Sequence, residues 1–254
     1  TMRDGNRREH RQSRPIGTLT AAGMAEGPFL KNRGAYIVSG RYFVPALFLR
    51  AWSAAKSGSD DMRPYFGFYA LTAKLTYDLD PKNSLYASFY MGHDNLDFRL
   101  NDFEDSKKIS KSKAGFGWGN TIFSLRWSSV LRHNMFLSAT AYCSMLRNEK
   151  HSSYENTKDS YGSSADIYSR LTEFGAKVSV DHHLAGFWKL NYGVVSSLQN
   201  FTPQKIEYSS KGLTHRNNYG KMSLVSYGAF LNNRISLGSH FSLDLGGRAM
   251  LYDN

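Results

Sequence analysis

The chain has 254 residues, of which 41% are hydrophobic and 14% aromatic, so an ordered fold with a large apolar surface is possible. Its mean hydropathy of −0.47 argues against a bundle of membrane-spanning helices, and no apolar run approaches the roughly 18 residues that such a helix requires. A membrane β-barrel stays possible, because half of each barrel strand is polar. The single cysteine, Cys143, excludes an internal disulfide and a cysteine-based zinc site.

The net charge of +11 is compatible with nucleic acid or an anionic membrane surface as a partner. The 32 lysines and arginines are nevertheless scattered along the chain instead of forming one stripe. The densest basic cluster is at the amino-terminal end, so we predict a polar basic loop or tail over residues 1–15, with an arm that contacts phosphates of nucleic acid or lipid A as the alternative. The cluster consists of Arg3, Arg7, Arg8, Arg11 and Arg14.

Two hairpins are predicted first along the chain, one joining residues 16–26 to 35–47 and one within residues 65–91. In the second hairpin, apolar residues such as Leu71 and Leu75 alternate with polar residues such as Thr72 and Lys74. This period of two is typical of a strand between an apolar and a polar environment. The segment Asp-Pro-Lys-Asn at residues 80–83 predicts a tight reversal between the two strands.

The same pattern continues downstream and predicts about ten strands in five hairpins. The later strands cover residues 120–130, 137–145, 173–181, 188–198, 224–237 and 241–252. Short reversals alternate with long polar segments at residues 93–113, 147–169 and 202–222, which we predict to be loops. Alternation of short turns and long loops is typical of an antiparallel up-and-down transmembrane β-barrel, whereas a soluble sandwich normally uses Greek-key connections.

Charged residues lie opposite the apolar positions of these strands. A soluble core could not accommodate them cheaply, because buried charges must be paired or hydrated. We therefore predict that they face a water-filled lumen. These candidate lumen-facing residues are Lys74, Arg126, Lys177, Arg234, Asp244 and Arg248.

Several segments resemble the barrel strands of TonB-dependent outer-membrane receptors, in particular the carboxypeptidase-regulatory-like or SusC-like group. They span residues 15–254, and it is their order and spacing together that carry the resemblance. The segments are residues 25–29 (Ala-Glu-Gly-Pro-Phe), 36–41 (Tyr-Ile-Val-Ser-Gly-Arg), 84–94 (Ser-Leu-Tyr-Ala-Ser-Phe-Tyr-Met-Gly-His-Asp), 118–120 with 125–127, 227–230 and 245–248.

This resemblance implies a fold of about 22 strands around an amino-terminal plug, in the outer membrane of a Gram-negative bacterium. The sequence shows no signal peptide, plug or TonB-contact segment and about half the strands, so we expect residues 16–254 to be part of a larger barrel. The implied function is import of a bulky nutrient such as a metal chelate or glycan. The implied partners are outer-membrane lipid, the rest of the barrel and plug, the TonB complex, an unidentified ligand and, in some receptors, a surface lipoprotein.

Candidate ligand contacts in the predicted loops are Phe98, Tyr154, Tyr161 and Tyr208. No nucleophile elbow, metal-binding pattern or cofactor motif is recognisable, so we predict that the protein is not an enzyme and binds no cofactor or metal. His182 and His183 are adjacent and would point to opposite faces of a strand, which makes a shared metal site improbable.

Two alternatives belong to other functional classes. The first is a complete ten-stranded outer-membrane barrel that acts as a pore or an enzyme, in which the first and last strands would have to pair. The second is a soluble basic β-protein that binds nucleic acid through its amino-terminal arm, although that alternative leaves the alternating connection lengths unexplained.

Overall fold

The predicted reversal after residue 80 is confirmed in the computed structural model of the chain, where Pro81 and Lys82 form the turn. One oxygen of the Asp80 carboxylate accepts hydrogen bonds from the backbone N–H groups of Lys82 (2.8 Å) and Asn83 (3.0 Å). The other accepts a hydrogen bond from the side-chain amide of Asn83 at 2.8 Å. Asp80 therefore organises the turn through its side chain, as aspartate commonly does in tight turns.

The stability of this turn should depend on pH. The pKa of Asp80 lies below its ordinary value, chiefly because the side chain of Asn83 donates to the carboxylate and secondly because the Lys82 amide does. A lowered pKa means that stabilisation is present above the unfolded-state pKa and is lost as the pH falls through the folded-state value. Chemical denaturation at a series of pH values should show Asp80→Ala to be less stable than the native protein at neutral pH, and the difference should shrink below about pH 4. A difference that stays constant with pH would contradict this role, and Asp80→Asn, which keeps an acceptor, is the control.

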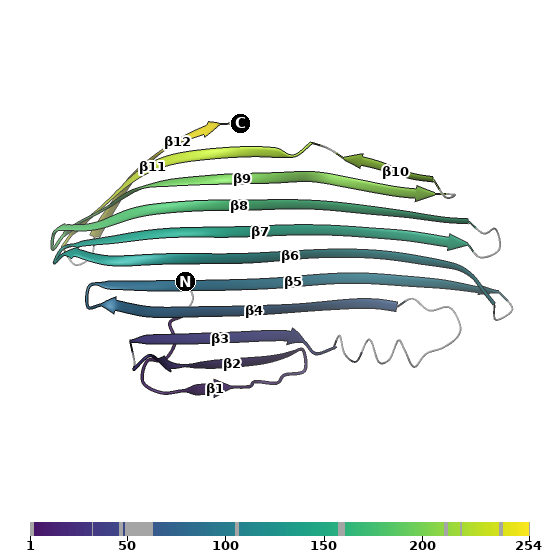
Figure 1. Cartoon of the computed structure of the whole chain (residues 1–254), viewed down its shortest axis with the longest axis horizontal. Coiled ribbons are helices and arrows are strands. Elements are labelled where there is room, and N and C mark those ends of the chain that lie inside the picture. Colours follow the sequence, from purple (N-terminus) through teal and green to yellow (C-terminus); the bar gives the residue numbers. More distant parts are fainter. Residues whose placement is uncertain are drawn as a thin grey trace.

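The structure describes residues 3–31, 33–45, 48, 63–104, 107–156, 161–210, 213–218, 220–238 and 241–253. Within these residues, the predicted all-β, antiparallel up-and-down fold is confirmed (Figure 1). The predicted end of the second strand at residue 47 lies outside the described residues. The strands are β1 (Arg11–Ser13), β2 (Thr20–Phe29), β3 (Gly34–Phe43), β4 (Arg63–Asp80), β5 (Asn83–Glu104), β6 (Lys107–Arg132), β7 (Met135–Asn156), β8 (Tyr161–Ala185), β9 (Trp188–Ser210), β10 (Leu213–Asn218), β11 (Met222–Leu237) and β12 (Phe241–Asp253).

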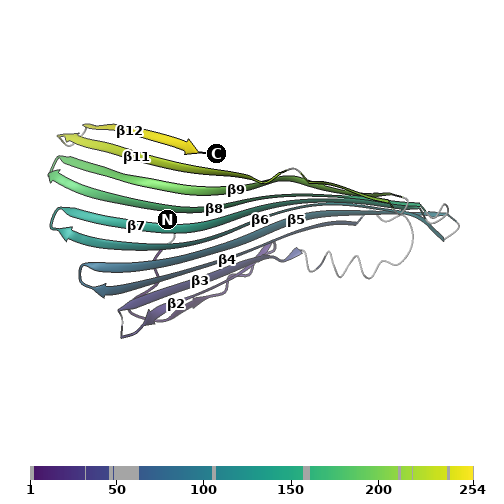
Figure 2. The same ribbon diagram turned by 45° about the horizontal axis from the view of Figure 1, so that its top comes forward.

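The strands form one twisted sheet in the order β1-β2-β3-β4-β5-β6-β7-β8-β9-β11-β12, and β10 pairs with β9 beside this path (Figures 1 and 2). The short strands β1 and β10 were not predicted. β1 and β12 are opposite edges of the sheet and do not pair with each other within the described residues. The first–last pairing that a closed ten-stranded barrel requires is therefore absent from the described sheet. No helix in the described part of the chain is both long and apolar enough to cross a membrane.

The prediction of long polar loops is wrong. Residues 93–104 continue β5, residues 147–156 and 161–169 extend β7 and β8, and residues 202–210 extend β9. These extensions are paired in register: Arg99 lies opposite Lys113, and Tyr154 lies opposite Ser163. The strands project as a sheet well beyond the hairpin cores, and the connections between β5 and β6, β7 and β8, and β9 and β10 at that end are short. We call the end with the Pro81–Lys82 turn the turn end, and the opposite end the distal end.

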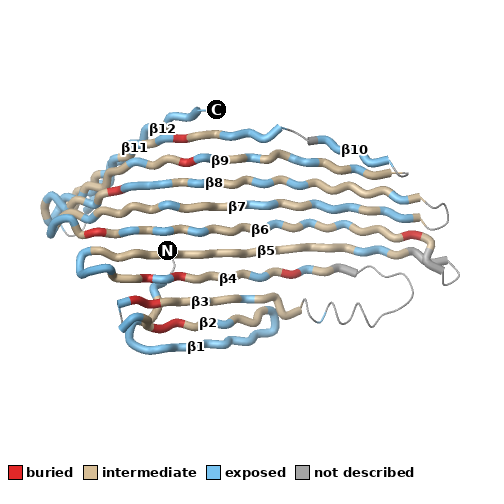
Figure 3. Tube along the Cα trace, in the orientation of Figure 1, coloured by how far each residue is buried: buried red, intermediate tan, exposed pale blue. Residues whose placement is uncertain are grey.

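The sheet has two chemically different faces. Over the central part of the strands, one face carries large apolar side chains, and Phe174 and Val194 on this face are 50% and 58% exposed. Ala35 is the only buried hydrophobic residue among those described, so the sheet has no apolar core of its own (Figure 3). We call this side the Phe174 face, and the opposite side the Lys177 face. The exposed apolar residues of the central band on the Phe174 face include Leu75, Phe123, Leu125, Trp127, Phe174, Val178, Val194, Leu198 and Leu231.

The polarity of the two faces is inverted at the distal end. Beyond Met145 on β7, the Phe174 face carries charged and polar residues such as Arg147, Glu149 and His151. There it is the Lys177 face that carries aromatic and aliphatic side chains, for example Phe116 and Ile167. Along this part of β7 the pairing with β6 and β8 stays in register, so only the composition of its two faces changes. The apolar band on the Phe174 face therefore ends at a definite level.

Candidate functional site on the Lys177 face

The six charged residues predicted to face a lumen lie on the same face of the sheet. The register places Arg126, Tyr86 and Thr76 in one row across β6, β5 and β4. On the other side of Arg126, the same row continues through Thr140 on β7 to Lys177 on β8. Each of the remaining charged residues lies an even number of positions along its strand from a residue of this face, so its side chain is on the same face. These six residues are Lys74, Arg126, Lys177, Arg234, Asp244 and Arg248.

Two of these cations share one aromatic ring. The guanidinium carbon of Arg126 lies 4.3 Å from the ring centroid of Tyr86, and the Lys74 ammonium lies 5.6 Å from it. A second such contact places the Lys177 ammonium 4.8 Å from the ring centroid of Phe230. Cations over aromatic faces are attracted by the ring quadrupole, so the aromatic residues hold the charges against the wall of the sheet.

Residues 3–8, which we call the amino-terminal segment, lie on the Lys177 face across β2, β3 and β4. The guanidinium of Arg3 pairs with the carboxylate of Glu26 at 2.9 Å, and the backbone N–H of Asn6 donates to the same carboxylate at 3.1 Å. The Glu26 side chain is only 3% exposed. The chain therefore reaches β1 from the Lys177 face, after its first described residues have crossed from β4 to β2.

Two further ion pairs fix the segment to β4. The Lys74 ammonium, whose side chain is 8% exposed, pairs with Asp4, and Arg7 pairs with both oxygens of Asp78. Thr76 lies between these two β4 residues, and its hydroxyl donates to Asp4 at 3.4 Å. Three basic residues of the amino-terminal cluster, Arg3, Arg7 and Arg11, are thus paired with carboxylates, the last of them with Glu9.

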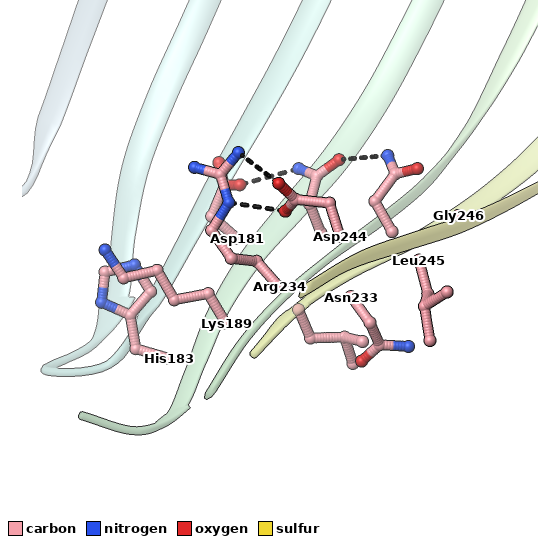
Figure 4. A pocket seen from close by; sticks show the side chains of 11 residues that line it. Asp181, His183, Lys189, Asn233, Arg234, Asp244, Leu245 and Gly246 are labelled. Carbon is pink, nitrogen blue, oxygen red and sulfur yellow. Dashed lines mark hydrogen bonds and ion pairs between the residues drawn. The ribbon is translucent and has the colours of Figure 1, made fainter. Parts of the chain in front are cut away.

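A polar pocket of about 520 Å³ opens on the Lys177 face at the turn end of β8, β9, β11 and β12 (Figure 4). The side-chain amide of Asn191 donates to Asp181 at 2.7 Å and accepts a hydrogen bond from Asn232 at 3.4 Å. Arg234 and Asp244 form a two-point ion pair, with N–O distances of 2.6 Å and 3.2 Å. The pocket is therefore lined by a chain of paired amides and charges that can meet a polar surface.

The four aromatic residues predicted to contact a ligand lie on strands near the distal end, and all four are on the Lys177 face. Phe98 and Tyr208 occupy the same row of the register, separated by Ala114, Ser152 and Ala165. Three small residues therefore form a low floor between two aromatic walls, which are four strands or about 19 Å apart. Tyr154 and Tyr161 form a pair nearby, with ring centroids 6.4 Å apart, and the Tyr161 hydroxyl is 3.3 Å from that of Ser210.

Other residues of this aromatic surface were not predicted as ligand contacts. Phe116 and Trp118 lie on the same face with ring centroids 5.1 Å apart, and the Lys150 ammonium lies 5.6 Å from the Phe116 ring centroid. The alternation of Leu96, Phe98 and Leu100 with charged neighbours is the sequence pattern from which this surface could have been predicted.

Comparison with known proteins places few constraints on the chain. No family model matches it, and no curated protein matches it. Among solved structures, the ferric yersiniabactin uptake receptor FyuA from Yersinia pestis matches with a TM-score of 0.44 and 12% sequence identity. The match covers 96% of this chain and 45% of the receptor chain, so the chain spans less than half the length of that receptor.

Proposed function

We propose that this chain is part of the wall of a TonB-dependent transporter in the outer membrane of a Gram-negative bacterium, with kinship to the SusC-like group, and that the transporter imports a bulky nutrient such as a metal chelate or glycan. Half-exposed apolar residues on the Phe174 face, among them Phe174, Val194 and Phe123, support the membrane location. Such a surface is favourable against lipid and unfavourable against water, since each half-exposed large side chain forgoes roughly half of the about 1.5–3 kcal/mol that full burial would give.

The position of the amino-terminal segment is the observation that carries the transport proposal. It lies on the Lys177 face and is held by ion pairs to Glu26, Lys74 and Asp78. A domain joined ahead of Arg3 would consequently start on that face, which is the lumen side if the Phe174 face meets lipid. In this proposal a plug fills the lumen, the pocket around Asn191 and Arg234 meets its polar surface, and the TonB complex acts through the plug.

The proposal can be tested on source cells. An antibody against residues 65–91 should detect the protein in the outer-membrane fraction, in a band several times larger than 28.7 kDa. Uptake of ⁵⁵Fe-loaded siderophores and of fluorescent oligosaccharides should then be measured in cells lacking this gene or lacking TonB. Loss of uptake of the same probe in both strains is expected. Uptake that requires this gene and not TonB would indicate a passive pore and overturn the proposal.

The aromatic row at the distal end should contribute to ligand capture. Removing Phe98 and Tyr208 together, as Phe98→Ala and Tyr208→Ala, should weaken binding of the transported probe more than tenfold, because burial of one aromatic side chain contributes about 1.5–3 kcal/mol. The dissociation constant should be measured on the purified intact protein. Phe123→Ala, which removes an exposed aromatic side chain from the Phe174 face outside the distal end, is the control and should leave the constant unchanged. An equal loss of affinity in both variants would contradict the assignment of the Lys177 face at the distal end to ligand binding.

A further inference from the structure

Two arginines face each other across β7 and β8 on the Phe174 face. Arg147 and Arg170 are direct partners in the register, so their Cβ atoms lie about 5 Å apart. Both are accessible: the Arg147 side chain is 48% exposed, and Arg170 is exposed. Like charges directly opposite each other in a sheet are unfavourable unless an anion lies between or above them.

The protein compensates this charge only in part. The carboxylate of Glu149 lies 3.7 Å from the Arg147 guanidinium, and Arg170 makes no ion pair with any residue that the structure describes. In the same row, the neighbour of Arg147 on β6 is Gly119 and the neighbour of Arg170 on β9 is Thr202. The pair is therefore open on both sides and keeps a net positive charge.

A local irregularity accompanies the pair. Tyr168 and Arg170 are two positions apart on β8, but their partners Lys205 and Thr202 are three positions apart on β9, so a β-bulge lies on β9 opposite Arg170. Bulges bend a strand and re-aim the side chains next to them. The pairing on the β9 side of Arg170 is therefore interrupted, while β8 itself keeps its regular pairing with β7 at Arg170.

The level of the pair coincides with the end of the apolar band. Met145 and Thr172, the preceding partners on the same face, lie two residues closer to the turn end, or about 7 Å along the strands. If the band lies in the hydrocarbon region, the arginines lie at the level of the lipid headgroups.

Beyond the arginines, the same face contains a polar trough of about 270 Å³. Gly115 and Gly117 form part of its floor, and carboxylates of Asp97 and Glu149 contribute to its walls together with Tyr168. The phenol of Tyr168 is protonated at neutral pH, so its hydroxyl can donate a hydrogen bond into the trough. Carboxylates that accept and a phenol that donates suit the hydroxyl groups of a sugar.

We propose that Arg147, Arg170 and the adjoining trough bind the phosphorylated saccharide headgroup of a membrane glycolipid. The order of chemistry along the Phe174 face, from apolar band to arginine pair to polar trough, matches acyl chains, phosphate and saccharide in turn. This inference rests on the membrane location in the proposed function, and it assigns no role to the glycolipid in transport.

The test uses the intact protein, purified in detergent and stripped of bound lipid. Binding of diphosphoryl lipid A, of dephosphorylated lipid A and of inorganic phosphate should be measured by native mass spectrometry and by thermal shift. The double variant Arg147→Gln, Arg170→Gln should lose diphosphoryl lipid A binding by tenfold or more. Lys177→Gln with Arg248→Gln, which removes two cations from the opposite face, should bind as the native protein does.

Each other outcome decides against the inference. The native protein and the Arg147, Arg170 double variant could bind diphosphoryl lipid A with equal affinity, or the native protein could bind the phosphorylated and dephosphorylated probes equally. Either result would show that the arginines are solvated surface residues that do not bind the headgroup. Complete displacement by millimolar inorganic phosphate would assign the pair to a free anion instead of a glycolipid. Because this assay requires neither TonB nor uptake, failure of the transport proposal is seen separately in the cell experiments.

Discussion

Phe174→Arg should lower the free energy of unfolding of the intact protein in lipid vesicles by about 2–4 kcal/mol, the loss typical of a cation near the bilayer midplane on the lipid side of a barrel. Phe174 is half exposed in the middle of the apolar band, between Cys143 and Leu198 in the register. An arginine there would lose its hydration without gaining a partner. Urea denaturation, followed by tryptophan fluorescence, measures the difference.

Ser144→Arg is the matched control for this substitution. Ser144 lies next to Cys143 along β7 and on the Lys177 face, opposite Glu173. An arginine at this position would meet water and a carboxylate, so the expected loss is below about 1 kcal/mol. Similar losses in both variants would mean that the two faces share one environment, and the assignment of the Phe174 face to lipid would be abandoned.

Glu26→Ala should release the amino-terminal segment from the sheet. The buried Glu26 carboxylate accepts hydrogen bonds from Arg3 and from the backbone of Asn6, and hydrogen bonds to charged groups contribute about 1.5–3 kcal/mol each. Losing them should raise the population of the detached segment by a factor of ten or more. Trypsin cleavage after Arg7 or Arg8 under native conditions, followed by mass spectrometry, measures this opening.

A steric variant tests the same contact by an independent route. A Cβ atom at Gly5 would overlap the carbonyl group of Tyr36, so Gly5→Ala should also accelerate cleavage. Gly23→Ala introduces a Cβ atom into open space on β2 and should leave the rate unchanged. Native-like cleavage rates in both Glu26→Ala and Gly5→Ala would show that the segment is held by something other than these contacts.

The sequence predicts the hairpin cores of this fold well, because period-two patterns and turn chemistry are local. The alternation around Leu71 and Leu75 and the aspartate at Asp80 each determine a feature that the structure contains. Strand length was underestimated for a physical reason. The segment Leu96-Asp97-Phe98-Arg99-Leu100 alternates as regularly as the cores do, but its apolar set faces the other way and its net polarity resembles that of a loop.

The candidate site was predicted in part. Charges at alternating positions were sufficient to group Lys74, Arg126 and Lys177 on one face, since the period of two determines which side chains share a side. The position of the amino-terminal segment could not be predicted, because its ion pairs join residues about 20 to 70 positions apart, as in Arg3 with Glu26 and Lys74 with Asp4. The pairing of Arg147 with Arg170 likewise depends on the exact register of β7 and β8.

Nearly every strand of this sheet pairs with the strand next to it in the chain, and β9 with β11 is the one pairing in the main path that skips a strand. Ordering each added strand therefore closes only a short stretch of chain, so the entropic cost per step is small. Assembly can proceed hairpin by hairpin from any point. Cooperativity should then decline outward from the long central strands β5 to β9, where the paired stretches are longest.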